Sequence, residues 1–177
     1  MGETVTVRYL TIVRHAESSP ASVGESDYGR ILSDRGRVQC EELRAWASAD
    51  TSLGRFGPTV ALVSAAARTR ETFRRSFDGT DFVEHVEFSE LIYNGRRAVS
   101  AEDLLIDVAA IDPVTTSLLV IGHSPTVLEL MYALSRELPP SLRKGRFALG
   151  GAYVIELPDD APVGLDHYDV VASYLPG

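Results

Sequence analysis

Residues 5–18 read VTVRYLTIVRHAES, in which a run of β-branched and apolar residues ends in Arg14, His15 and Glu17. Valine, isoleucine and threonine favour extended backbone, so residues 5–13 are predicted to form a strand. In parallel sheets, functional side chains gather where strands end and helices begin. The stretch therefore predicts an α/β fold with a site at the end of its first strand.

Two further short apolar runs, residues 59–63 (TVALV) and 117–121 (SLLVI), follow the same plan. Continuous apolar runs of this length suit central strands that are buried on both faces of a parallel sheet. Residues 82–88 alternate apolar and polar side chains instead, which is typical of a strand nearer the edge. Two late segments, 152–157 and 168–174, are expected to complete the sheet.

Apolar side chains at helical spacing predict helices between the strands, over residues 34–49, 65–76, 101–111 and 126–138. Ser100 and Asp103 form a capping-box pattern at the start of the third helix. Ser124 is expected to cap the fourth, with Pro125 in its first turn. The alternation of strands and helices predicts a three-layer α/β/α sandwich with a mainly parallel sheet, formed by a single domain over residues 1–177.

The composition limits the class of protein. Of the 177 residues, 45% are hydrophobic and 24% are charged, as in soluble globular proteins. Seventeen basic residues stand against 25 acidic ones, a net charge of −8 that argues against a sequence-independent nucleic-acid binder. The sequence has no signal-peptide pattern and no apolar run near the roughly 20 residues of a membrane helix. The single cysteine, Cys40, cannot form an internal disulfide, which indicates a reducing compartment. From these features together we expect a cytoplasmic protein with neither nucleic acid nor membrane as a partner.

Polar clusters stand where three of the predicted strands end. Arg14 and His15 follow the first strand, Arg68 opens the helix after the second, and His123 follows a later one. Because the carboxyl ends of parallel strands meet at one edge, these side chains are expected to converge. Arginine forks bind phosphoryl oxygens bidentately, helix N-termini add N–H donors, and a neutral imidazole is a competent nucleophile. The set therefore suits phosphoryl transfer, in which charge spreads over three oxygens.

The motifs VRHAES at 13–18, SAAARTRET at 64–72 and IGHS at 121–124 together resemble the histidine phosphatase superfamily, which includes phosphoglycerate mutases and acid phosphatases. The stretch DYGRILSDRGRVQCEEL at 27–43 resembles its short SixA-type phosphohistidine phosphatase branch. The resemblance covers residues 5–130 and implies a phosphoglycerate mutase-like α/β sandwich that needs no metal and no organic cofactor. The mutase-type asparagine and tryptophan after the first motif are absent, which favours hydrolysis over mutase activity.

Carried over position by position, the resemblance implies a role for each of four residues. His15 is the nucleophile that becomes phosphorylated, and Arg14 and Arg68 bind the phosphoryl oxygens. His123 is the second histidine of the pocket and donates a hydrogen bond to the transferring group. The implied reaction has two steps, since His15 displaces the leaving group and water then hydrolyses the phosphohistidine.

The resemblance also implies a general acid and two supporting residues. The family places a carboxylate after the third strand, where Glu90 in FSELIYNG fits best and Glu87 competes. This residue would protonate the leaving group and then act as the base for water. Glu17 is expected to orient the loop after the first strand, and Ser64 to support the reacting groups from behind.

The expected substrate is a small phosphorylated metabolite or a protein that carries phosphohistidine. A second hypothesis is a regulatory module that binds a phosphoryl group without turnover, although pure binding needs no nucleophile such as His15. A third is a serine esterase that uses Ser124, because GHSPT at 122–126 resembles a nucleophile elbow. Pro125 argues against it, because the oxyanion hole needs a backbone N–H from the residue after the serine.

The remaining charged side chains are expected to lie at the surface. His85 falls on the polar face of its strand, and the arginine pair at 96–97 follows a turn, so both are expected to be solvated. The cluster of Arg143, Lys144 and Arg146 is expected to form a charged loop, with contact to an acidic partner as the alternative.

Overall fold

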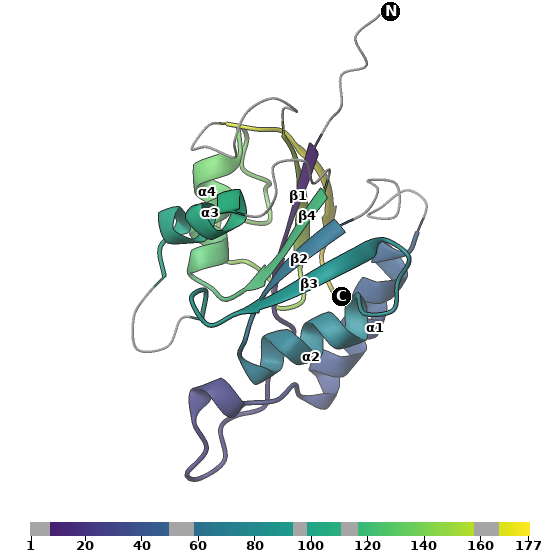
Figure 1. The fold of residues 1–177 in the computed structure, drawn as a ribbon, viewed down its shortest axis with the longest axis vertical. Helices are drawn as coiled ribbons and strands as arrows, with labels where there is room; N and C mark the ends of the chain where they lie inside the picture. Colours follow the sequence, from purple (N-terminus) through teal and green to yellow (C-terminus); the bar gives the residue numbers. More distant parts are fainter. Residues whose placement is uncertain (1–7, 50–58, 94–98, 111–116, 158–166) are drawn as a thin grey trace, which may run out of the picture.

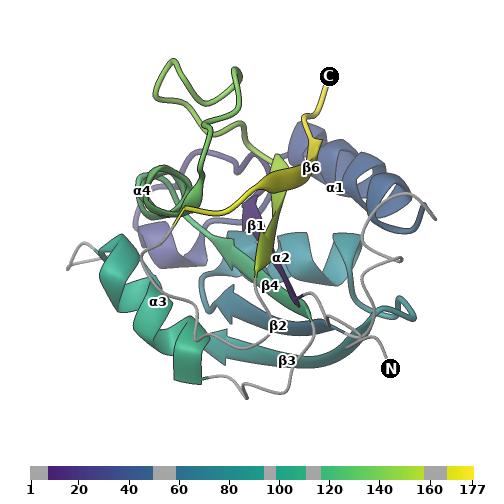
Figure 2. The ribbon, with the colours of Figure 1, turned by 90° about the horizontal axis from the view of Figure 1, so that it is seen from above.

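A central sheet with helices on its two faces makes up the fold (Figures 1 and 2). The computed structural model of the chain describes residues 8–49, 59–93, 99–110, 117–157 and 167–177. Within these ranges the strands are β1 (Arg8–Arg14), β2 (Thr59–Ser64), β3 (Val83–Ser89), β4 (Ser117–Gly122), β5 (Ala152–Leu157) and β6 (Val170–Tyr174). The helices are α1 (Asp34–Ala47), α2 (Ala67–Ser76), α3 (Ala101–Ala110) and α4 (Thr126–Leu134), with a short 3₁₀ helix, η1 (Asp27–Gly29).

The strands follow the order β3-β2-β4-β1-β5-β6 across the sheet. The pairs β1–β4, β4–β2 and β2–β3 are parallel, whereas β5 is antiparallel to both β1 and β6. Helices α1 and α2 cover one face of the sheet, and α3 and α4 cover the other (Figures 1 and 2). The predicted three-layer α/β/α sandwich with a mainly parallel sheet is therefore confirmed.

Burial along the strands follows the sequence pattern. All six residues of β4 and five of the six of β2 are buried, as continuous apolar runs predict for central strands. β3 lies at the edge of the sheet, and three of its seven residues are exposed. Leu43 and Phe73 pack α1 and α2 against one face, and Leu104 and Leu130 pack α3 and α4 against the other. The apolar residues therefore fill two cores, one on each side of the sheet.

The starts of two helices differ in how well the sequence predicted their caps. Ser100 and Asp103 form the expected capping box at α3, with the Asp103 N–H donating to Ser100 Oγ at 3.0 Å and the Ser100 N–H donating to Asp103 Oδ2 at 3.1 Å. The predicted cap of α4 is wrong, because Pro125 rather than Ser124 holds the N-cap position and no side chain caps this end. The carbonyl of His123 accepts a backbone N–H from the first turn of α4 at 3.0 Å instead.

The end of α4 also differs from the prediction, because the helix stops at Leu134 rather than at residue 138. The Arg136 N–H donates to the Tyr168 carbonyl at 2.7 Å, and the Tyr168 N–H donates to the Leu134 carbonyl at 2.7 Å. The chain therefore leaves the helix to pair with the segment before β6, and helical periodicity contains no sign of such a long-range pairing. Where the other element ends are described, they agree with the predicted ones to within two residues.

A glycine lets α1 approach the end of β1 closely. A Cβ atom at Gly36 would lie 2.0 Å from the carbonyl oxygen of Glu17, so no other residue fits without a shift of the backbone. The Ser33 N–H donates to this same carbonyl at 3.0 Å, and the Glu17 N–H donates to Oε1 of Gln39 at 2.9 Å. The first turns of α1 are therefore held against the residues that follow β1, which fixes the loop that begins the candidate site.

Candidate active site

Three strands end at one edge of the sheet, and the predicted site residues lie at these strand ends or within four residues after them. β1 ends at Arg14, β2 at Ser64 and β4 at Gly122. The His15 N–H donates to the Gly122 carbonyl at 3.1 Å, which brings together the residues that follow β1 and β4. The rings of His15 and His123 consequently lie side by side, with 5.2 Å between their centroids.

His15 is almost fully buried, with 7% of its surface exposed. Its Nδ1 lies 2.7 Å from the Ala16 carbonyl oxygen, and because a carbonyl can only accept, Nδ1 carries the proton and donates. The lone pair of the neutral ring is then on Nε2. Burial, together with the positive charges of Arg68 and Arg14, lowers the pKa of His15 to about 3. The ring is therefore neutral near pH 7, with an unprotonated nitrogen that can act as a nucleophile.

His123 is also buried, and its Nε2 lies 2.8 Å from Oγ of Ser64. Its Nδ1 is buried and has no hydrogen-bond partner among the described residues. Burial, with the neighbouring His15 and Arg68, lowers the pKa of His123 to about 2. A buried polar group without a partner costs about 1–3 kcal/mol, so a ligand atom that pairs with Nδ1 would be stabilising. The structure thus places Ser64 against His123, and the supporting role of Ser64 stays a prediction.

Two arginines flank the imidazoles. The side chain of Arg68 is 7% exposed, and it donates from Nη1 to the Asp27 carbonyl at 2.7 Å and from Nη2 to the Asp27 carboxylate at 3.0 Å. Arg14 donates from Nη1 to the Phe147 carbonyl at 2.6 Å, and its buried Nε has no partner in the described part of the chain. Burial lowers the pKa of Arg14, and the charges of both arginines act on both imidazoles. This arrangement of two cations around two neutral rings suits a tetrahedral anion.

One carboxylate that enters the site, Asp27, is not among the predicted site residues. Asp27, in η1, accepts hydrogen bonds from Arg68, from Nη1 of Arg30 at 2.9 Å and from the hydroxyl of Tyr93 at 2.9 Å. Burial alone would raise the pKa of Asp27, but the hydrogen bonds from Arg30 and Tyr93 and the charge of Arg68 lower it to about 2. The Tyr93 ring lies 5.6 Å from the ring of His123. No spacing or composition signal marks the contact with Arg68, because it joins residues 41 positions apart.

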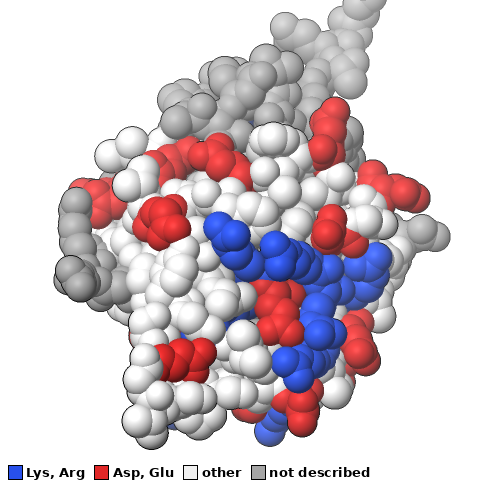
Figure 3. Space-filling model, turned by 60° about the horizontal axis from the view of Figure 1, so that its bottom comes forward, with Lys and Arg blue, Asp and Glu red and all other residues white. Residues whose placement is uncertain are grey.

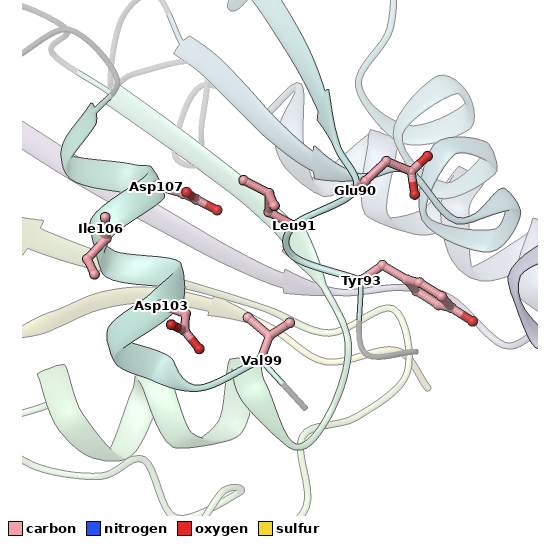
Figure 4. A pocket seen from close by; sticks show the side chains of 7 residues that line it. All are labelled: Glu90, Leu91, Tyr93, Val99, Asp103, Ile106 and Asp107. Carbon is pink, nitrogen blue, oxygen red and sulfur yellow. The ribbon is translucent and has the colours of Figure 1, made fainter. Parts of the chain in front are cut away.

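The two candidate general acids lie outside this cluster. Glu90 is exposed and accepts a hydrogen bond from the hydroxyl of Tyr28, and its carboxylate points away from α3 (Figure 4). Glu87 is exposed on β3, and its charge acts on Asp107 of α3. Asp27 is the carboxylate whose charge acts most strongly on the second imidazole. Neither glutamate has a described contact with the imidazoles, so protonation of a leaving group by either one stays a prediction.

Glu17 lies behind the nucleophile and connects it to α1. Its carboxylate accepts a hydrogen bond from the Ser33 hydroxyl at 2.8 Å, in addition to the backbone contacts with α1 given above. These contacts hold Glu17 against α1, and its orienting role stays a prediction. His85 is exposed, as the sequence predicts, and Cys40 is buried. The arginine pair at 96–97 lies outside the described residues.

Charged side chains are interleaved on the face that carries α2 and η1, where blue and red groups lie next to one another (Figure 3). Arg37 pairs with Glu71 at 3.1 Å, and Arg75 pairs with the same carboxylate at 2.9 Å. These arginines of α1 and α2 are thus already paired with an acidic side chain of the same chain.

The ranges that the structure describes contain neither a metal-binding cluster nor a membrane-spanning helix. Among those residues, no group of three or more histidine, cysteine, aspartate or glutamate side chains is placed to hold a metal ion. None of the helices described has the length and apolar character that a membrane crossing needs.

Comparison with solved structures defines the class of protein by its fold. A SixA-named protein from Nakamurella multipartitia matches with a TM-score of 0.76 and 24% sequence identity over 96% of both chains. A second from Agrobacterium tumefaciens matches with a TM-score of 0.74 and 25% identity, over 96% of this chain and 99% of that one. The fold is therefore that of the phosphoglycerate mutase-like α/β sandwiches, as the motifs predicted.

Within this class, three of the similar structures carry the name of one branch, SixA. The protein histidine phosphatase SixA, solved in complex with tungstate, matches with a TM-score of 0.71 and 18% identity, over 93% of this chain and 95% of that one. The predicted resemblance to the SixA-type branch is thus confirmed by solved structures. No protein-family model and no curated protein matches the chain.

Proposed function

We propose that this chain is a metal-independent phosphatase that hydrolyses phosphohistidine on a protein, through a covalent phosphohistidine intermediate on His15. The observation that carries the proposal is the pair of neutral, buried imidazoles, with 5.2 Å between centroids, flanked by the charges of Arg14 and Arg68. The likeness to SixA structures supports it, since those proteins are named as phosphohistidine phosphatases. Tungstate, found with one of them, is a tetrahedral oxyanion like phosphate.

In the first step, Nε2 of His15 forms a bond to phosphorus while the bond from phosphorus to the substrate imidazole breaks. The substrate ring leaves as a neutral imidazole and keeps the proton on its other nitrogen. The positive charge that this ring carried while phosphorylated is now on the ring of phospho-His15. No net proton transfer is needed, because one imidazole replaces another. Arg14 and Arg68 stabilise the charge on the equatorial oxygens, and Nδ1 of His123, which has no partner among the described residues, is free to donate to one of them.

In the second step, the oxygen of water bonds to phosphorus and the bond to Nε2 of His15 breaks. Both protons of the water stay with the phosphate, which leaves as dihydrogen phosphate and ionises in solvent. The hydrogen bond from Nδ1 of His15 to Ala16 holds the ring in the tautomer that both steps use. This step needs no separate base, because both protons end on the phosphate, and the exposed Glu90 that the resemblance supplies as a base is held by the hydroxyl of Tyr28.

A phosphomonoester places a stronger demand on the site, because an alkoxide must receive a proton as it leaves. Glu90 is exposed and hydrogen-bonded to Tyr28, which favours a substrate whose leaving group needs no acid. This geometry supports phosphohistidine over a phosphomonoester as the substrate.

The Glu90→Gln variant separates the two substrates. We expect it to retain phosphohistidine-peptide hydrolysis to within about threefold and to lower hydrolysis of an alkyl phosphate ester by about 10²-fold, the usual contribution of a general acid. Glu84→Gln is the matched control, since it removes an exposed carboxylate of β3 to which no role is assigned, and both rates should persist. An equal loss of both activities in Glu90→Gln would contradict the proposal that only the ester needs this acid. A wild-type protein that hydrolyses esters alone would contradict phosphohistidine as the substrate.

The alternative functions have distinct readouts. A binding module would bind phosphate tightly but release none from phosphoimidazole. For the proposed phosphatase we expect phosphate release from phosphoimidazole, and because no metal is needed, this release should continue in the presence of a chelator. A serine esterase would be inactivated by a fluorophosphonate at Ser124, which is partly exposed beside His123. We expect no label there, because Pro125 offers no backbone N–H to an oxyanion.

A further inference from the structure

A cavity of about 520 Å³ lies beside Arg14, between the loop at 139–151 and the last residues of the chain. The residues that line it include Ser141, Arg146, Phe147, Leu149, Tyr153 and Leu175. None of the steps of the proposed reaction uses this cavity, and it is distinct from the space beside Glu90 in Figure 4.

The cavity adjoins the candidate phosphoryl site. Arg14 lines it, and the charge of the same arginine acts on His15 and His123. The Gly150 N–H donates to the His15 carbonyl at 3.1 Å, and the Arg14 N–H donates to the Gly151 carbonyl at 3.2 Å. A substrate whose phosphoryl group reaches His15 can therefore place its neighbouring part in this cavity.

The lining combines apolar surface with positive charge. Phe147, Leu149 and Leu175 supply apolar side chains, Arg14 and Arg146 supply two cations, and none of the described lining residues is acidic. This local excess of positive charge contrasts with the net charge of −8 of the whole chain. The ligand that complements the cavity carries an apolar group and an anionic one.

Arg146 has unused hydrogen-bonding capacity. It is exposed and forms no hydrogen bond or ion pair with the described residues, whereas Arg143 of the same loop pairs with Glu137 at 3.1 Å. Nε of Arg14 is buried and likewise has no partner in the described part of the chain. Two cationic side chains with free donors therefore line one cavity.

We propose that this cavity is a subsite for the segment next to the phosphorylated histidine of a protein substrate, and that it selects an acidic and an apolar side chain. The inference rests on the proposed function. The carboxylate pairs with Arg146, and the apolar side chain packs on Phe147 and Leu149. Exposed Arg143 and Lys144 continue the basic loop beyond the cavity, over a surface that a protein covers and a small metabolite does not.

The test uses three phosphohistidine peptides that share a leucine near the phosphohistidine and differ at one position, which holds Glu, Gln or Lys. We expect the wild type to have its lowest KM for the Glu peptide. Arg146→Ala should raise that KM by about three- to tenfold, as expected for one partly exposed charge pair, and abolish the preference for Glu over Gln. Lys144→Ala removes the same charge from the same loop outside the cavity lining, and it should change the KM by less than about twofold. Arg146→Glu should reverse the preference toward the Lys peptide.

Equal KM values for the three peptides in the wild type would overturn the subsite. Equal rises in Arg146→Ala and Lys144→Ala would also overturn it, because a long-range field and not a contact would then be responsible. Phosphoimidazole, which lacks the peptide segment, separates the two claims. Its hydrolysis without any peptide preference contradicts only the subsite, whereas no phosphate release from it contradicts the proposed function. In that case, calorimetric titration of His15→Asn with the three peptides still decides whether the cavity prefers Glu.

Discussion

The Asp27 carboxylate lies 3.0 Å from Nη2 of Arg68, and the backbone carbonyl of Asp27 accepts from Nη1 of the same guanidinium at 2.7 Å. One residue of η1 thus holds both ends of the arginine fork. The Arg68 side chain is 7% exposed, whereas that of Asp27 is 49% exposed. The loop after β1 therefore determines the direction in which Arg68 presents its remaining N–H groups to a phosphoryl oxygen.

Substitution of Asp27 tests this positioning. Asp27→Ala should lower kcat/KM by about tenfold, because a hydrogen bond to a charged group contributes about 1.5–3 kcal/mol and the backbone carbonyl still holds Nη1. Asp27→Asn keeps an acceptor and should lose less than Asp27→Ala. Steady-state kinetics on phosphoimidazole measure both. A gain in activity would instead mean that the carboxylate competes with the substrate for Arg68.

Arg68 itself should contribute more than its neighbours on the same helix. Arg68→Ala is expected to lower kcat by about 10²–10³, if it acts like one donor to a developing oxyanion. Arg74→Ala removes an exposed arginine of α2 and should leave kcat unchanged. Comparable losses in the two variants would show that the charge of the helix, and not the contact at the site, is responsible.

The lowered pKa values of His15 and His123 predict how stability changes with pH. The unfolded histidines bind protons below about pH 6.5, whereas the folded ones stay neutral until about pH 3 and 2. The unfolded state therefore binds more protons in this window, so the free energy of unfolding falls as the pH drops from about 6.5 toward 3. Each such histidine contributes up to about 1.4 kcal/mol per pH unit.

Urea unfolding at pH 7, 6 and 5 measures this slope. In the His123→Asn variant, the slope of the free energy of unfolding against pH should be smaller by roughly 1 kcal/mol per pH unit below pH 6.5, because residue 123 no longer titrates. The control His85→Asn, at an exposed position on β3, should keep the wild-type slope. A wild-type slope in His123→Asn would mean that the buried ring takes up a proton near its ordinary pKa. The Asp27 carboxylate does not enter this window, because its pKa of about 2 affects stability only below about pH 4.

Gly36→Ala tests the close approach of α1 to the end of β1. Alanine normally stabilises a helix relative to glycine by about 1 kcal/mol. Here a Cβ would lie 2.0 Å from the Glu17 carbonyl oxygen, so we expect destabilisation of about 1–3 kcal/mol, the usual cost of overpacking. Gly29→Ala has its nearest neighbour at 3.6 Å and should change stability by less than about 0.5 kcal/mol. A more stable Gly36→Ala variant in thermal unfolding would contradict the described contact.

Local sequence patterns were sufficient to predict the three-layer α/β/α sandwich. The apolar runs of β2 and β4 identified central strands because burial on both faces leaves no polar positions. The expectation that His15 and His123 lie together followed from the geometry of parallel strands, whose carboxyl ends share an edge. The rings do lie together, although the roles assigned to them stay predictions.

Contacts between distant segments could not be predicted in this way. The pairing of Tyr168 with Leu134 ends α4 early, and the contact between Asp27 and Arg68 brings a carboxylate into the site. Both depend on which loops meet after folding, and neither has a periodicity. The resemblance points to Glu90 because the family places a carboxylate after the third strand, but the hydroxyl of Tyr28 holds this side chain in a way that no local pattern indicates.

The most direct test of the account is the site of covalent phosphorylation. Wild-type protein mixed with phosphoimidazole and quenched within milliseconds in strong base should carry one acid-labile, base-stable phosphate, which peptide mapping places on His15. His15→Asn should carry none and release no phosphate, while still binding tungstate. Turnover without any phosphorylated protein, or an equal phosphate content in His15→Asn, would contradict the central claim.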